Sequence, residues 1–298
     1  MASRKDMLLA YATVPPLAFM VLWVFVYPAS YRVGWWPGYT ARMARLVAQP
    51  CMPAPLDVIT KYESHTAVKL THLLPSGVWA LCGAVQLLPG VRSARPWLHR
   101  MSGRLMLLSA AAVFVGYFLI EARGLIFDAP VAEFYNSGAP GDALGAATAG
   151  YVDAGRQDGA SGGRNGGTGG GGGDDGGGIW TKLQQQQPAN IAGLRAIALW
   201  FALTGGMAGY HARRRRYAAH RRWAVRHLAA GGWVIVQRLF IGCAMLWARA
   251  TGLAWSMRQR HELFGAAGAT AIALCLAGAE VFFLATGKWD HADAGRAK

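Results

Sequence analysis

The stretch Met101–Ile120 reads MSGRLMLLSAAAVFVGYFLI, and Arg104 is its only charged residue. A helix of about 20 residues rises about 30 Å, which is the thickness of a bilayer's hydrocarbon core. Five other stretches share this length and apolar character, so the sequence predicts an all-α bundle of six transmembrane helices. The predicted spans are approximately Leu8–Tyr27, Thr66–Leu88, Met101–Ile120, Asn190–Tyr210, Arg226–Trp247 and Phe264–Thr286.

The composition agrees with an integral, multi-pass membrane protein. Of the 298 residues, 53% are hydrophobic and 15% are charged, which is more apolar than an ordinary soluble domain. A net charge of +15 would suggest nucleic-acid binding in a soluble protein, but most Lys and Arg residues lie between the apolar stretches. Cations in that position suit anionic lipid headgroups. We therefore predict the lipid bilayer and anionic headgroups as partners, and no nucleic acid.

The distribution of cations predicts the orientation and the organisation of the chain. The N-terminus, the loops after the second and fourth spans, and the C-terminal tail hold about half of the 30 Lys and Arg residues, so we expect both termini in the cytoplasm. A Gly- and Gln-rich segment lacks the apolar residues for a core and is expected to be a disordered insertion. The predicted units are an anchor helix with a connector (1–65), a helical hairpin (66–120), the insertion (121–188), a second hairpin (189–249), and the sixth span with the tail (250–298).

Polar residues within the predicted spans mark a candidate site, because a charge in the bilayer costs a few kcal/mol. Arg238 lies near the middle of the fifth span and Glu280 lies in the sixth; they could form an ion pair lining a cavity, or a structural clamp with Glu280 reaching the interface. Lys69 and His72 lie one turn apart and can face the same interior surface, although Lys69 and Arg195 could instead extend to the headgroups. The predicted intramembrane polar site comprises His72, Gln86, Arg238 and Glu280.

The histidines allow a different function, namely electron transfer through b-type haem. Membrane cytochromes hold such haems between histidines on neighbouring helices. His72 lies toward one side of the membrane and the other candidates lie toward the opposite side, so the pairing is incomplete. A metal held by His99, His220 and His227 is another interpretation, and a small-solute transporter or a lipid-interacting scaffold is a third. The candidate haem ligands are His72, His99, His220 and His227.

Motifs near the helix ends carry a resemblance to a known family. They are Thr71-His72 with Gly77 and Gln86, Leu98-His99-Arg100-x-x-Gly103-Arg104, His220-Arg221-Arg222-Trp223-x-x-Arg226, and Gln237-Arg238-Leu239. Over about Tyr62–Trp247, apart from the insertion, the chain resembles the predicted membrane proteins catalogued as domain of unknown function 2306. The resemblance implies the architecture and no established activity. The chain departs from the family pattern at Val225, at His227 and in the long insertion.

Overall fold

The computed structural model describes residues 4–55, 62–126 and 188–286. Every regular element in these ranges is a helix, and six helical segments are long and apolar enough to cross a membrane. The predicted all-α transmembrane bundle is therefore confirmed. The long helices are α1 (Arg4–Phe25), α5 (Leu74–Leu87), α7 (Pro96–Ala122), α11 (Pro188–Arg213), α12 (Tyr217–Thr251) and α13 (Met257–Thr286).

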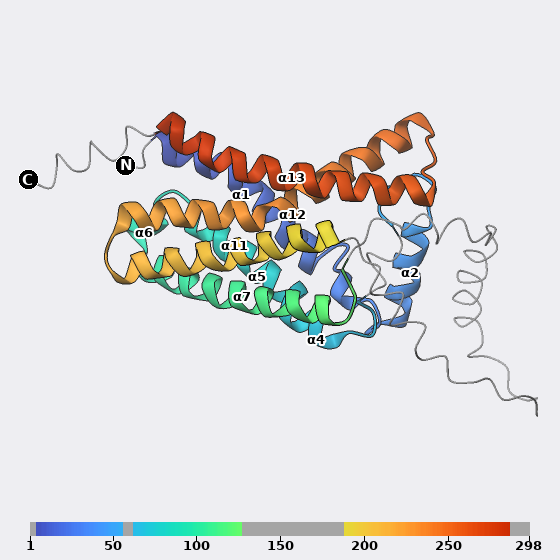
Figure 1. Ribbon diagram of the computed structural model, residues 1–298, viewed down its shortest axis with the longest axis horizontal. Helices are drawn as coiled ribbons and strands as arrows, with labels where there is room; N and C mark the ends of the chain where they lie inside the picture. Colours follow the sequence, from blue (N-terminus) through green and yellow to red (C-terminus); the bar gives the residue numbers. More distant parts are fainter. Residues whose placement is uncertain (1–3, 56–61, 127–187, 287–298) are drawn as a thin grey trace, which may run out of the picture.

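The six helices form a layered bundle with a distinct basic end (Figure 1). We use the name "basic end" for the end at which α1 begins, α13 ends and the short helix α6 (Val91–Ala94) lies. Helix α5 packs between α1 and α7, and α12 packs between α11 and α13. Toward the opposite end α1 and α13 diverge in Figure 1, and that is where the connector helix α2 (Pro37–Val47) lies.

Three helices begin at least five residues earlier than their apolar residues predict, among them α13, which starts at Met257 rather than at Phe264. Helix α7 starts at Pro96, where a proline is tolerated because the first helical N–H has no intrahelical partner. Helix α12 starts at Tyr217, and its 35 residues rise about 52 Å at 1.5 Å per residue. Gly252 caps its C-terminal end, with a φ of 70° that suits a glycine in the left-handed region. The basic motifs are thus the first turns of long helices rather than loops.

The entry to the second span is irregular. Helix α4 (Thr66–Val68) passes into η2 (Lys69–Leu73), a five-residue π-helical segment that leads into α5. Pro75 explains the irregularity, because proline lacks an N–H and its ring clashes with the carbonyl of the residue four positions earlier, Thr71. The π-helical segment changes the direction of the side chains that precede the proline.

The connector between the first two spans folds against the bundle rather than remaining a simple loop. It contains η1 (Ser30–Arg32) and α2, and Val47, Met52 and Ala54 pack on Ile241 of α12 and on α13. Glu121–Ile126, expected to belong to the insertion, is also folded: Ile126 packs on Val68 and Ile120. The remainder of the predicted insertion, 127–187, lies outside the described residues.

Two buried cations hold this connector. Lys69, fully buried, donates from Nζ to the carbonyl oxygens of Val33 and Glu63, the latter at 2.7 Å. Arg260 of α13 donates to the carbonyl oxygens of Val47 and Gln49 at 2.7 and 2.9 Å. Of the two alternatives for Lys69, extension to the headgroups is therefore wrong, because backbone carbonyls in the interior satisfy its ammonium group.

Candidate functional site

A cavity of about 990 Å³ occupies the half of the bundle remote from the basic end. It is lined by the second halves of α1 and α7, by the middle of α12 and by the first halves of α5, α11 and α13, and connector residues complete its wall. Most of the lining is apolar or aromatic, with a few polar side chains among them. A pocket of this size is at the upper end of the roughly 300–1,000 Å³ typical of small-molecule sites.

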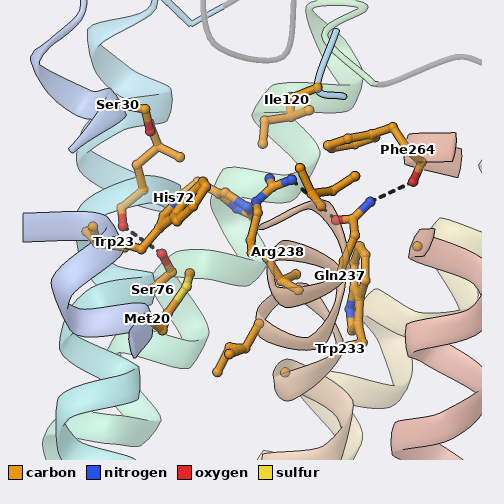
Figure 2. Close-up of a pocket in the computed structure, with 18 of the residues that line it drawn as sticks. Met20, Trp23, Ser30, His72, Ser76, Ile120, Trp233, Gln237, Arg238 and Phe264 are labelled. Carbon is orange, nitrogen blue, oxygen red and sulfur yellow. Dashed lines mark hydrogen bonds between the residues drawn. The ribbon is translucent and has the colours of Figure 1, made fainter. Parts of the chain in front are cut away.

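Arg238 places a guanidinium at the wall of this cavity (Figure 2). Its carbon Cζ lies 5.9 Å from the ring centroid of Trp23 and 5.0 Å from that of Phe264. Among the described residues, its one hydrogen bond is a long one of 3.4 Å from Nη1 to Oε1 of the adjacent Gln237. No ion pair involves Arg238 in the part of the chain that the structure describes. Cation–π contacts therefore hold the guanidinium, while most of its five donors lack a strong acceptor among the described residues.

The side chain of Gln237 is oriented by a hydrogen bond to the backbone of α13. The buried amide donates from Nε2 to the carbonyl oxygen of Phe264 at 2.9 Å, which joins α12 to α13. Figure 2 shows this bond beside Arg238. Gly268 makes the approach possible, because a Cβ there would lie 3.0 Å from Gln237 Nε2. The two neighbouring residues thus divide their roles: Gln237 fastens the two helices and Arg238 faces the cavity.

His72 lines the same cavity from the opposite wall. Its Nδ1 lies 3.1 Å from the carbonyl oxygen of Val113, so Nδ1–H donates and the tautomer is fixed. Gly116 of α7 permits this contact, because a Cβ there would lie 2.7 Å from His72 Cβ and 2.9 Å from the backbone of His72 and Thr71. The π-helical segment and the missing side chain of Gly116 together place the imidazole beside the cavity.

The structure brings His72 and Arg238 to one cavity, but not the other two predicted site residues. Gln86 lies near the basic end, where Nε2 donates to the carbonyl oxygen of His99 at 2.5 Å and to Ser102 Oγ at 2.7 Å. It joins α5 to α7, and Gly103 packs against its amide. Gln86 is therefore a link between two helices and not a wall of the cavity.

Glu280 is paired with Arg226 and not with Arg238. The two form a bidentate ion pair with N–O distances of 2.7 and 2.8 Å, and the side chains of Arg226 and Glu280 are 24% and 52% exposed. Arg226 also lies over the rings of Trp223 and Phe283. The predicted Arg238–Glu280 pair is wrong because the antiparallel α12 and α13 bring Arg226, which lies much nearer the basic end, to the depth of Glu280.

The four haem candidates lie in different environments. His72 lies at the cavity, whereas His99 and His220 lie near the basic end, close enough for their charges to interact. His220 Nδ1–H donates to the carbonyl oxygen of Ala208 at 2.9 Å. His227 is buried with both nitrogens engaged: Nε2 accepts the indole N–H of Trp79 at 3.0 Å, and Nδ1 lies 3.1 Å from a backbone carbonyl oxygen. As it stands, His227 offers no lone pair to a metal.

His227 instead forms the centre of the helix packing. Its ring stacks on Phe201 at 4.4 Å between centroids and meets Trp79 edge-on at 5.8 Å. Gly205 makes room for the ring, because a Cβ there would lie 3.0 Å from Cε1 of His227. One imidazole thus joins α5, α11 and α12, a role that its position at the start of the predicted fifth span did not indicate.

Comparisons of the chain with protein-family models, with curated proteins and with solved structures find no match.

Proposed function

We propose that this protein is a membrane-embedded binding protein, of the transporter class, for a small organic anion with an apolar body. The observation that carries the proposal is Arg238: a guanidinium without an ion-pair partner among the described residues, at the wall of an apolar cavity of about 990 Å³. With the basic end in the cytoplasm, as the charge distribution predicts, the cavity would lie in the outer half of the membrane.

The energetic argument rests on what a guanidinium needs. Placing an arginine near the centre of a membrane span costs about 2.5–3.5 kcal/mol on insertion scales, and aromatic rings return about 0.5–2 kcal/mol each. Trp23 and Phe264 therefore offset part of the cost without using the N–H donors. A carboxylate or a similar anion in the cavity would accept those donors in a bidentate arrangement.

Matched amphiphiles test whether the cavity selects an anionic head. We would measure equilibrium binding of labelled dodecanoate to the protein in nanodiscs, and compete with dodecanol and dodecylamine, which have the same chain length. Hydrogen bonds to charged groups contribute about 1.5–3 kcal/mol, so Arg238→Gln should weaken dodecanoate binding by about 10- to 150-fold.

Two variants make the result specific. Arg238→Lys keeps the charge but loses the planar pair of donors, so it should bind dodecanoate with intermediate affinity. Arg195→Gln is the control, because Arg195 lies in a span but is paired with Glu121 and does not line the cavity. Equal binding of dodecanoate by the native protein and by a correctly folded Arg238→Gln variant would refute the proposal.

A further inference from the structure

The shape of the cavity bears on how a ligand enters it. The connector closes the end remote from the basic end, and residues such as Tyr31, Met43 and Met52 form part of the cavity wall. This closure is fixed at two points, because buried Lys69 and Arg260 each bind connector carbonyls. Opening it would leave both cations, and the carbonyls that they bind, without partners, a cost of about 1–3 kcal/mol or more for each group.

In contrast to the end that the connector closes, the side of the cavity between α1 and α13 is lined by exposed residues. The α13 residues Gly265, Ala266 and Ala269 line the cavity and are exposed rather than buried. Tyr27, which follows the end of α1, also lines the cavity and is 45% exposed. A Cβ on Gly265 would meet no atom within 4 Å. Helices α1 and α13 do not pack closely on each other and they diverge toward this end (Figure 1), so the exposed lining residues mark an open side of the cavity with small residues on one rim.

We infer that a single-chain amphiphile with one anionic head, already resident in the bilayer, enters the cavity sideways between α1 and α13 and places its head at Arg238. This inference rests on the proposed function and names its ligand class and its route. Gly265, Ala266 and Ala269 lie within a segment of α13 that is long and apolar enough to cross a membrane, so in a bilayer this side of the cavity would face hydrocarbon, which favours an acyl chain over a water-soluble solute. One guanidinium in an apolar cavity complements one anionic head with a long apolar tail.

The amphiphile's position follows from the lining. Its head would lie between Trp23 and Phe264, which flank the guanidinium. His72 and Ser76 line the wall near the head, with Ser76 Oγ donating to the carbonyl oxygen of Leu73 at 2.7 Å. The chain would extend past Gly265 and Ala269 to the lipid. No covalent step is involved.

The rim residues provide the test. In nanodiscs that contain a diazirine-labelled C16 fatty acid, we would measure the rate of its capture by the protein for Ala266→Trp and Ala269→Trp. The control is Gly278→Trp, because Gly278 is exposed on the same helix, has no atom near its Cβ position and does not line the cavity. We expect the rim variants to capture the probe at least tenfold more slowly than native protein, with the control unchanged, and hexanoate in the aqueous phase not to compete.

The outcomes separate the route from the site. Two results would overturn lateral entry by a bilayer-resident amphiphile: capture that is unaffected by either rim variant, and efficient competition by aqueous hexanoate. In either case, weaker dodecanoate binding by Arg238→Gln would still support the anion site. Equal dodecanoate binding by the native protein and by Arg238→Gln would refute both the entry route and the anion site. If a Trp variant fails to fold, as judged by its Tm, Ala266→Leu and Ala269→Leu serve the same purpose with a smaller side chain.

Discussion

The contact between Gly116 and the π-helical segment gives a stability prediction with a definite sign. At Gly116 a Cβ would approach His72 Cβ to 2.7 Å and the backbone of His72 and Thr71 to 2.9 Å. Backbone atoms cannot move aside cheaply, so Gly116→Ala should cost about 3 kcal/mol, the upper end of the usual range for overpacking. The higher helix propensity of alanine returns about 0.8–1.0 kcal/mol. The net loss is about 2 kcal/mol.

Thermal unfolding in mild detergent measures this loss. For a chain of this size about 2 kcal/mol corresponds to a fall in Tm of about 4–8 °C, recorded at one fixed scan rate because membrane proteins often unfold irreversibly. The matched control is Gly206→Ala on α11, where the added Cβ meets nothing within 4 Å; its Tm should rise by about 2–4 °C. A rise of Tm in both variants would refute the close approach of α7 to the π-helical segment.

Two further predictions concern ionisable groups away from the cavity. A double-mutant cycle with Arg226→Met and Glu280→Gln should give a coupling free energy of about 0.6 kcal/mol, and at most about 1.7 kcal/mol; a coupling of zero, from the Tm values of the four proteins, would contradict the bidentate pair. His65 Nδ1 accepts from Arg123 Nη1 at 3.1 Å, and burial, then the positive charges of Arg123 and Lys69, lower its pKa below the ordinary 6.5. The unfolded chain therefore binds more protons at low pH than the folded protein does, so the stability contributed by neutral His65 is full above about pH 6.5 and falls below it. His65→Gln should reduce this pH dependence of Tm. An identical pH profile in the variant would exclude His65 as its source.

The transmembrane architecture could be predicted from the sequence because each span satisfies the bilayer by itself. A helix satisfies its own backbone hydrogen bonds, and 20 apolar residues suffice to cross, whatever the neighbouring helices are. The ends of the helices were less predictable. Pro96–Arg100 and Tyr217–Arg226 are helical but polar, because a helix that emerges into the headgroup region no longer needs apolar residues.

The partners of the polar groups could not be read from the sequence. Which arginine faces Glu280 depends on the depth at which α12 and α13 align, and the sequence places both Arg226 and Arg238 on the same helix. Lys69 and Arg260 bind backbone carbonyls, which every residue carries and no motif marks. The need for glycine at position 116 could not be predicted either, because the residue that requires it, His72, lies 44 positions earlier in the sequence. Only the presence of Arg238 and His72 within spans pointed to the cavity.

The contrast among the intramembrane cations explains why the cavity, and not the other polar clusters, is assigned the function. Lys69 and Arg260 are satisfied by backbone carbonyls, and Arg195 and Arg226 by carboxylates. Each of these four therefore has a structural role that accounts for the cost of placing it there. Arg238 has aromatic rings and one long hydrogen bond, and it faces a space large enough for a ligand. A guanidinium held in position with its donors largely unused is better suited to binding an anion than to joining two helices.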